Sequence, residues 1–433
     1  MAELIVIADD LTGAAECAAA CASQGFRATV LLYSSGDRIA DLPNSDVLAI
    51  DANTRLQSAG HAAETTAEVV RRLTTSGAPA TGCFIFKKLD STLRGNFGTE
   101  IAAVLRVRSD MTSNADKVSI VLAPALPAQG RTTVGGFQLV HGRALEESDL
   151  ACSGVGGPRS DIAMVLGDAG LSCTLIDLGA VRSGLSVLQN AMAGLAPETD
   201  VILCDAETDE DLHAIAEASM ILGERTVWAG SAGLAGHLPH AIKMATSGND
   251  VEPGDISPGP TLLVVGSPAS LSREQARLLA AMPDVVTVPV AHGSLVDDRT
   301  ACAMIREGLQ SGRDVLVVFD EDQSFGGDEA THLTKALSRA VASCAPILGG
   351  LVMTGGETAR AILDEIGIRR LRLLGEVESG LPFSIADGWT RPLPVLTKAG
   401  GFGSPQTLVR CREFLQRMER ASAPSEARSP FVS

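Results

Sequence analysis

The chain has 433 residues, of which 45% are hydrophobic and only 3% aromatic, and its formal net charge is −17. This length exceeds what one hydrophobic core normally supports, so we expect two domains with aliphatic cores. The acidity argues against nucleic-acid and membrane-surface partners, because both bind basic surfaces. No apolar run reaches membrane-spanning length, and the chain opens without a basic leader, so we predict neither a membrane span nor a secretory signal. Nine cysteines without CxxC spacing favour reduced thiols and a cytoplasmic location.

Short β-branched runs alternate with alanine- and leucine-rich amphipathic segments over the first 250 residues. We predict strands at residues 4–8, 29–33, 47–51, 83–87, 118–124, 173–179, 200–206 and 225–230. Between the first of these strands we predict helices at residues 14–24, 59–75 and 98–107. Buried strands that alternate with helices form parallel sheets covered on both faces.

The pattern lapses over residues 247–260, SGNDVEPGDISPGP, a composition typical of an exposed linker. A second alternating series follows, with strands predicted at 261–266, 285–290, 314–320 and 350–356 and helices at 272–282 and near 404–418. The sequence therefore predicts an α/β protein of two domains, about 1–250 and 258–420, each with a mainly parallel sheet flanked by helices.

Ligands of open α/β sheets bind beyond the carboxyl ends of the strands, so polar residues there are candidates for a site. Asp9 and Asp10 follow the first predicted strand, and Arg55 follows the third. Adjacent carboxylates before a helix can orient a hydroxyl, accept its proton or hold Mg²⁺. The alternative is that Asp10 or Thr12 only caps the helix.

The stretch KKLDSTLRGNFGTE, residues 87–100, follows an apolar run at the same predicted edge. Lys87, Lys88 and Arg94 can face an anion, and glycines in this stretch let the backbone approach a ligand. The alternative is a solvated lysine pair with Asp90 capping a turn. Arg131 follows the fifth predicted strand. Residues 135–145 are predicted as a hairpin that could fold over a ligand-binding cleft at this edge.

The second half has three glycine-bearing loops, VVGSPAS (264–270), MTGGETA (353–359) and KAGGFGS (398–404). Each precedes a helix and offers free N–H groups, which suits phosphates. Glu357 could reach a metal or a water; the alternative is a first-turn acid that stabilises the helix dipole. No Walker A sequence is present, and GxGxxG does not follow the first strand, which weakens an NAD-dependent dehydrogenase interpretation.

Together these segments resemble the four-carbon acid sugar kinase family. The matching pieces keep the family's order: IADDLTGA (7–14), NTR (53–55), KKLDSTLRGNFGTE (87–100), PALPAQGRTTVGG (124–136), VVGSPAS (264–270), TGGETARAIL (354–363), LGEVESGLP (374–382) and KAGGFGS (398–404). The resemblance implies ATP-dependent phosphorylation of the terminal hydroxyl of a four-carbon sugar acid, D-threonate first, with D-erythronate or 3-oxo-tetronate as alternatives. It also implies an acid-sugar-binding N-terminal domain, a nucleotide-binding C-terminal domain and an active site in the cleft between them.

The resemblance also assigns residues by position. On the acid-sugar side it places Asp9, Asp10, Thr12, Arg55, Lys87, Lys88, Asp90, Ser91, Arg94 and Arg131. Among them Asp10, Asp90, Lys88 and Arg94 are the expected catalytic residues, with Asp10 first and Asp90 second as acceptor of the hydroxyl proton. On the ATP side it places Ser267, Ser270, Thr354, Gly355, Gly356, Glu357, Gly401 and Gly403. Mg²⁺ with a lysine or arginine would neutralise the γ-phosphate; the sequence does not assign the metal ligands.

Departures from the common family pattern at Ala15, Glu16 and Cys17, and at Ala399 and Gly401, leave the substrate preference open. A non-catalytic sugar-acid sensor, a clamp that closes on its ligand, is a further alternative. We expect the sugar acid and ATP as small-molecule partners, and a homodimer is left open.

Overall fold

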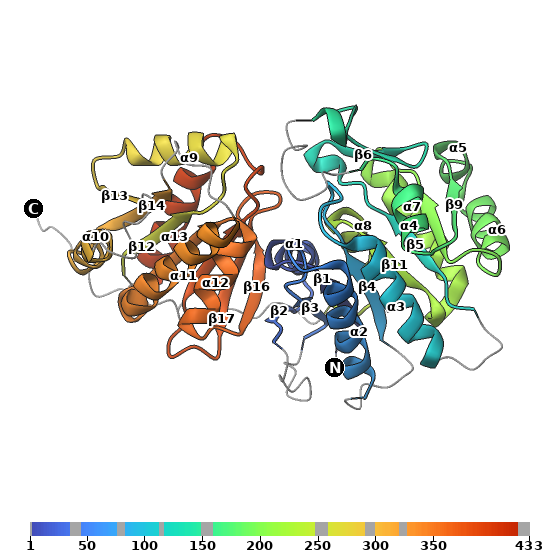
Figure 1. Cartoon of the computed structure of the whole chain (residues 1–433), viewed down its shortest axis with the longest axis horizontal. Helices are drawn as coiled ribbons and strands as arrows, with labels where there is room; N and C mark the ends of the chain where they lie inside the picture. The colour runs from blue at the N-terminus through green and yellow to red at the C-terminus, as the bar shows by residue number, and fades with distance from the viewer. Residues whose placement is uncertain are drawn as a thin grey trace, which may run out of the picture. The chain divides into compact units, whose positions relative to one another are not determined.

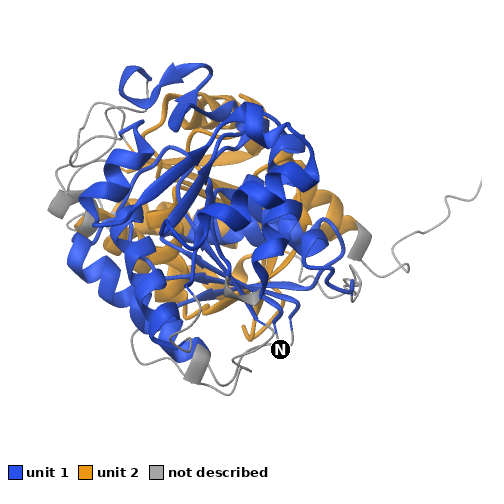
Figure 2. Ribbon diagram, turned by 90° about the vertical axis from the view of Figure 1, so that its right-hand side faces the viewer, with its two compact units in different colours: residues 1–248 blue, residues 249–433 orange. Residues whose placement is uncertain are grey.

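The computed structural model of the chain describes residues 2–34, 45–75, 83–111, 117–148, 159–246, 259–290, 299–319 and 327–422. The chain divides into two compact units, Met1–Gly248 (unit 1) and Asn249–Ser433 (unit 2), which Figure 2 separates by colour. The predicted linker falls outside the described residues, apart from positions 259 and 260. Within the described ranges, no helix has the length and apolar character needed to cross a membrane.

Unit 1 is built on a parallel sheet with the strand order β2-β3-β1-β4-β11-β5-β10-β9 (Figure 1). Its strands are β1 (Leu4–Ala8), β2 (Ala28–Leu32), β3 (Val47–Asp51), β4 (Phe84–Lys88), β5 (Ile120–Ala123), β9 (Cys173–Ile176), β10 (Val201–Cys204) and β11 (Val227–Gly230). The strands predicted for this half and their parallel arrangement are confirmed. Because all of them are parallel, their carboxyl ends meet at one edge of the sheet.

Helices cover both faces of this sheet. They are α1 (Leu11–Ala22), α2 (Ala59–Thr75), α3 (Phe97–Met111), α4 (Ile162–Asp168), α5 (Leu178–Val181), α6 (Leu185–Leu195), α7 (Asp209–Ser219) and α8 (Ala232–Ala241). One face forms a core in which Ile5 and Ile7 of β1 pack with residues of α2, α3 and α4. The alternate residues Leu4 and Val6 are equally buried and point to the other face, where α1 packs against the sheet and α8.

A small antiparallel sheet follows β5. It consists of β6 (Arg131–Val134), β7 (Phe137–Val140) and β8 (Arg143–Ala144). The hairpin predicted at residues 135–145 is therefore present, as part of three strands. His141 and Gly142 form its second turn with positive φ values of 49° and 76°, the backbone that two-residue hairpin turns require. The His141 N–H donates to the Gly130 carbonyl at 2.8 Å, which ties this turn to the residue before β6.

Unit 2 has a second sheet with the order β13-β14-β12-β15-β18-β17-β16. Its strands are β12 (Thr261–Val265), β13 (Val285–Val290), β14 (Asp314–Phe319), β15 (Gly350–Thr354), β16 (Arg370–Glu376), β17 (Pro382–Asp387) and β18 (Pro394–Lys398). β12, β13, β14, β15 and β18 are parallel, and β17 and β16 add an antiparallel edge. The sequence predicted the first four strands and not β16–β18.

The helices of unit 2 also lie on both faces of its sheet (Figure 1). They are α9 (Ser270–Ala280), α10 (Arg299–Gln310), α11 (Gly327–Cys344), α12 (Gly356–Ile366) and α13 (Thr407–Ser422). Residues of α9 and α13 share one apolar core with the sheet, whereas α11 packs between α10 and α12. The mainly parallel α/β fold predicted for both halves is confirmed.

Candidate functional site

At the carboxyl edge of the unit 1 sheet, Arg55 joins the two carboxylates that follow β1. Its Nε and Nη2 donate to the two oxygens of Asp9, each at 2.8 Å, and its Nη1 donates to Asp10 Oδ2 at 2.5 Å. Burial raises the pKa of the Asp9 carboxyl, but Arg55 outweighs it and the net shift is downward. Asp9 is therefore a buried anion, and the Arg55 guanidinium that serves as its counter-charge also contacts Asp10.

Asp10 also caps helix α1. Its carboxylate accepts a hydrogen bond from the Gly13 N–H at 2.8 Å and another from Thr12 Oγ1 at 2.5 Å. The capping role that the sequence allowed for Asp10 is confirmed. With Arg55 added, this carboxylate accepts three hydrogen bonds within the chain.

Lys87 and Lys88 end strand β4 and point to opposite faces of the sheet. The Lys87 ammonium lies 3.1 Å from Glu100 Oε2 on α3 and donates to the Lys88 carbonyl at 2.8 Å. Glu100 also accepts a hydrogen bond from Thr54 Oγ1. Because both side chains are 1% exposed, Lys87 lies in a sealed ion pair and does not present its ammonium to solvent.

Lys88 faces helix α1, where its ammonium lies 3.9 Å from Glu16 Oε2. A Cβ at Gly13 would lie 2.9 Å from Lys88 Nζ, so glycine is needed to leave room for the lysine. Burial raises the pKa of the Glu16 carboxyl to about 7, with Lys88 opposing that shift and the Asp10 charge adding to it. Glu16 was not among the predicted site residues.

The loop after β4 places a second arginine–carboxylate pair. Asp90 accepts hydrogen bonds from the Thr92 N–H at 3.3 Å, from Thr92 Oγ1 at 2.9 Å and from Arg94 Nε. Burial alone would raise the pKa of Asp90, but Arg94 first and Arg55 second lower it by more, so the net shift is downward and the carboxyl stays ionised. The Arg94 side chain is 39% exposed, so its guanidinium remains accessible to an anion.

The remaining predicted residues of unit 1 lie close to this group. Ser91 follows Asp90, and its carbonyl accepts a hydrogen bond from Gln138 of β7 at 2.8 Å. Arg131 opens β6 and is buried; burial lowers its pKa, and the charges of Asp90 and Glu16 oppose that shift. The structure thus gathers the predicted acid-sugar residues at one edge of the sheet, with Lys87 turned into the interior.

In unit 2, the three glycine loops meet around Ser267. They follow β12, β15 and β18, which are neighbours in the sheet. A Cβ at Gly400 would lie 1.8 Å from Ser267 Oγ, and one at Gly355 would lie 3.5 Å from the Ser267 nitrogen. Thr358 of α12 touches the same place, because a Cβ at Gly266 would lie 2.1 Å from its Oγ1. The absence of side chains lets the three loops pack this closely.

Two helices present their N-termini at these loops. α9 begins at Ser270 and α12 begins at Gly356, and the N-caps Ala269 and Gly355 make no side-chain hydrogen bond to either helix. Their first N–H groups are thus not satisfied by a capping side chain, which is the arrangement that binds phosphate oxygens. Glu357 is exposed in the first turn of α12.

The other predicted residues of the ATP side take different places. Thr354 ends β15 fully buried, and its hydroxyl has no hydrogen-bond partner among the described residues. Gly401 and Gly403 are exposed in the loop after β18. Gly403 has a local reason to be glycine, because a Cβ there would lie 2.3 Å from Thr407 Oγ1.

Lys398 holds the loop after β18 in shape. Its ammonium is buried and donates to the carbonyls of Ala399, Gly400 and Phe402 at 2.9, 3.2 and 3.0 Å. Burial lowers its pKa to about 8. By drawing three carbonyls inward, the lysine fixes the backbone on which the neighbouring N–H groups lie.

Glu16, Glu100 and Lys398 were missed by reasoning from the sequence. Glu16 lies on a helix far along the chain from Lys88, whereas Glu100 closes the stretch 87–100 itself and gave no sign that it would face Lys87. Lys398 had one usable signal, a lysine that closes an apolar run just before the glycines of KAGGFGS. No cage of three or more His, Cys, Asp and Glu side chains occurs in the part of the chain that the structure describes.

Comparison with known proteins agrees with this division into two sites. Residues 4–238 match the family model described as a sugar-binding N-terminal domain, and residues 262–408 match a nucleotide-binding C-terminal domain. A D-threonate kinase of Cupriavidus necator is 37% identical over 435 residues, which cover 97% of this chain and 99% of that protein. A D-threonate kinase of Bordetella bronchiseptica is 31% identical, with 95% and 97% of the two chains covered.

More distant relatives extend the family likeness. Proteins named D-erythronate kinase and 3-oxo-tetronate kinase match over most of their lengths. A crystal structure of a Salmonella typhimurium protein superposes with a TM-score of 0.76 at 21% identity, covering 95% of this chain and 99% of that one, which shows a shared fold. The chain belongs to the four-carbon acid sugar kinase family, whose members include kinases of D-threonate, D-erythronate and 3-oxo-tetronate.

Proposed function

We propose that this protein transfers the γ-phosphoryl group of ATP to the terminal 4-hydroxyl of D-threonate. The observation that carries the proposal is the presence, in one chain, of a buried cluster of acids and bases in unit 1 and of phosphate-type loops in unit 2. D-threonate is preferred because the two relatives described above at more than 30% identity are named D-threonate kinases. D-erythronate and 3-oxo-tetronate are the alternatives.

In unit 1, Arg94 is the group best placed to receive the substrate carboxylate. It is the most exposed of the three arginines in the cluster, Arg55, Arg94 and Arg131, and only its Nε is engaged by Asp90 and Thr92 in the contacts described for it. A guanidinium can bind a carboxylate through two parallel hydrogen bonds. Arg55, by contrast, is bound to Asp9 and Asp10 and orders the loops around the substrate.

In unit 2, the loops around Ser267 and the first turns of α9 and α12 would hold the triphosphate. Phosphoryl transfer depends mainly on positioning and on neutralising charge. The reaction further requires that the terminal phosphate held by unit 2 reaches the acid held by unit 1, as in the interdomain active site predicted from the sequence. We also propose domain limits of 1–250 and 258–420, a cytoplasmic location and a homodimer.

Mg²⁺ would accompany the nucleotide. The described residues form no metal cage of their own, which fits an ion that keeps several waters and binds through substrate phosphates and one or two carboxylates. Glu357, exposed in the first turn of α12, is the carboxylate we assign to that ion or to one of its waters. Bound Mg²⁺ would neutralise charge on the phosphates.

The test is an ADP-release assay with D-threonate, L-threonate, D-erythronate, L-erythronate and 3-oxo-tetronate. We expect the highest kcat/KM with D-threonate. Preference for another of these acids would change the proposed substrate but keep the kinase activity. Turnover of none of the five acids would overturn the proposal. Thermal stabilisation by the acid but not by Mg-ATP would instead indicate a sensor that binds without transferring phosphate.

A further inference from the structure

The proposed reaction needs a group that accepts the proton of the attacking hydroxyl, and the two aspartates expected for this task are poorly suited to it. Asp10 accepts hydrogen bonds from the Gly13 N–H, Thr12 and Arg55. Asp90 accepts from the Thr92 N–H, the Thr92 hydroxyl and Arg94. The oxygens of both carboxylates are thus occupied by donors of the chain itself, and Arg94 and Arg55 also lower the pKa of Asp90, which makes that carboxylate a weaker base.

Glu16 is the carboxylate in the same cluster that is not held in this way. Among the described residues it receives no hydrogen bond, and its one ion-pair partner, Lys88, lies 3.9 Å away. Its side chain is 9% exposed, and its oxygens are not among the sealed polar atoms that lack partners. The carboxylate is therefore enclosed but still reachable, with lone pairs free to accept a proton.

The local fold explains this placement. Glu16 lies three residues after Gly13 on α1, so both face the same side of the helix, toward Lys88. Gly13 leaves the space that the Lys88 ammonium occupies, and the Asp10 cap fixes where the helix begins. The Lys88 ammonium, like the Glu16 carboxylate, makes no hydrogen bond within the described residues.

We propose that Glu16 is the catalytic base of the proposed phosphoryl transfer and that Lys88 is the cation beside it. The substrate O–H bond breaks, its proton passes to a Glu16 oxygen, and the hydroxyl oxygen bonds to the γ-phosphorus. The bond from that phosphorus to the bridging oxygen breaks, and ADP leaves with the electron pair. Lys88 offsets charge on the phosphoryl group, and Glu16 then returns its proton to water at the exposed edge.

The pKa of Glu16 supports this role. Burial raises it to about 7, near the value at which a general base works best at neutral pH. Because the Glu16 carboxylate must be deprotonated to accept a proton, kcat/KM for the acid should rise with pH through about 7 and then level off. The charged or titratable groups that face Glu16 are Lys88, Asp10, Asp90, Arg55, Arg131 and Cys17.

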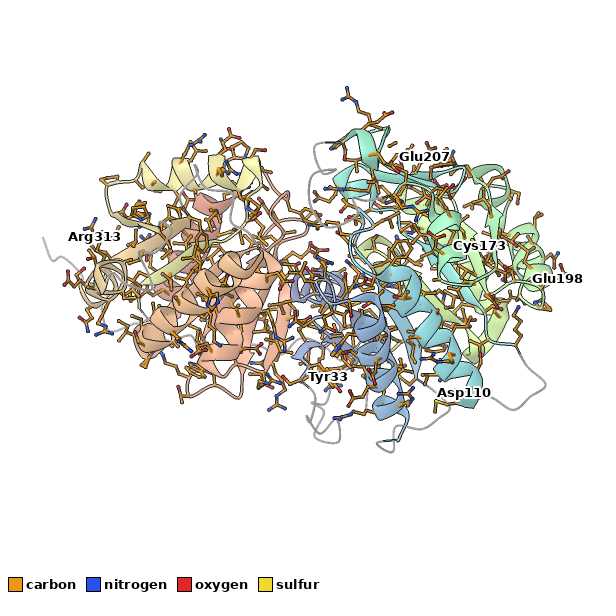
Figure 3. All side chains as sticks on the ribbon, in the orientation of Figure 1. Tyr33, Asp110, Cys173, Glu198, Glu207 and Arg313 are labelled. Atoms are coloured by element: carbon orange, nitrogen blue, oxygen red, sulfur yellow. The ribbon has the colours of Figure 1, made fainter. Side chains whose placement is uncertain are left out.

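The experiment compares wild type with Glu16→Gln, Glu16→Asp and the control Glu198→Gln. Glu198, labelled in Figure 3, is an exposed glutamate that follows α6. We expect Glu16→Gln to lower kcat by about 10²–10⁴-fold with little change in the KM for D-threonate, as for loss of a general base. Glu16→Asp should retain the pH limb at reduced kcat, and Glu198→Gln should behave as wild type.

The pH profile separates the outcomes, given that the proposal rests on the proposed function. The terminal phosphate of the nucleotide also titrates, near pH 6, so a limb that survives Glu16→Gln belongs to the nucleotide and overturns the assignment. A wild-type kcat/KM that stays flat around pH 7 overturns it too, even if Glu16→Gln does not fold. An active wild type with a fully active Glu16→Gln rejects only the role of Glu16, whereas a wild type inactive on all five acids rejects the function and this role together.

Discussion

At the residue scale, the two neighbouring lysines of β4 belong to different parts of the protein. Lys87 is paired with Glu100, both 1% exposed, whereas Lys88 lies buried beside Glu16, whose side chain is 9% exposed. The sequence shows that two cations are adjacent, but not which carboxylate each one meets, because that depends on the face of the sheet to which each lysine points and on how α1 and α3 pack there. The sequence predicted that both lysines face one anion. In the structure, Lys87 and Glu100 form a structural ion pair, and only Lys88 and Glu16 are assigned to the reaction.

This difference can be tested with matched substitutions on the same strand. Lys87→Met leaves Glu100 buried without its partner, so we expect the free energy of unfolding to fall by about 3–5 kcal/mol. Lys88→Met leaves Glu16 able to take up a proton and become neutral, so the free energy of unfolding of this variant should change little while its kcat falls. Urea unfolding and steady-state kinetics measure both effects. Adding Glu100→Gln to Lys87→Met should recover much of the lost stability; no recovery would contradict the pairing.

Arg55 and Arg94, which both pair with aspartates in unit 1, should differ in their effects on stability and on substrate binding. Arg55→Ala leaves Asp9 and Asp10 buried without a counter-charge, and we expect a loss of about 3–5 kcal/mol in unfolding free energy. Arg94→Ala removes a side chain that is 39% exposed, and Asp90 keeps Arg55 and Lys88 as nearby positive charges, so the free energy of unfolding should fall less than in Arg55→Ala. Loss of a charged hydrogen bond to the substrate should instead raise the KM for the acid about 10- to 100-fold. An Arg94→Ala enzyme with normal KM would show that the carboxylate binds elsewhere.

At the element scale, regular buried strands were easier to predict than irregular ones. β1 has the predicted bounds, Leu4–Ala8, because its apolar run is continuous. β17 and β18 each begin with a proline, and β16 contains an irregularity between Leu373 and Gly375. Prolines and bulges weaken the pattern that marks a strand. Missing β18 also hid Lys398, which organises the glycine loop that follows this strand.

The same loop gives a prediction about nucleotide binding. A methyl group at Gly400 would overlap Ser267 Oγ, whereas one at Gly401 would meet nothing within 4 Å. Gly400→Ala should push two of the three loops apart at a cost of about 1–3 kcal/mol, seen as a roughly 10- to 100-fold rise in the KM for ATP. Gly401→Ala should cause a much smaller rise. Equal effects of the two substitutions would mean that the meeting of the loops at Ser267 does not shape the nucleotide site.

At the scale of the whole molecule, the two units divide the chemical work. Unit 1 gathers charged side chains at the carboxyl edge of its sheet, and unit 2 offers mainly backbone groups of glycine-bearing loops. This division follows from the substrates, because a small acid is recognised by directed charges and a triphosphate by many N–H groups. The sequence predicted both halves of this arrangement from residues after strands, because parallel strands bring such residues to one edge.

The division also predicts how Mg²⁺ binds. Since Mg²⁺ in enzymes that bind nucleotides is usually held by substrate phosphates and only one or two carboxylates, the ion should arrive with the nucleotide, and Mg²⁺ alone should not raise the melting temperature. Mg²⁺ with ATP should stabilise the protein, by about 2.7 kcal/mol when the complex is present at a hundred times its Kd. A thermal-shift series with Mg²⁺, ATP and both together measures this. Stabilisation by Mg²⁺ alone would reveal a metal site within the protein, and EDTA should then lower the melting temperature even without ATP.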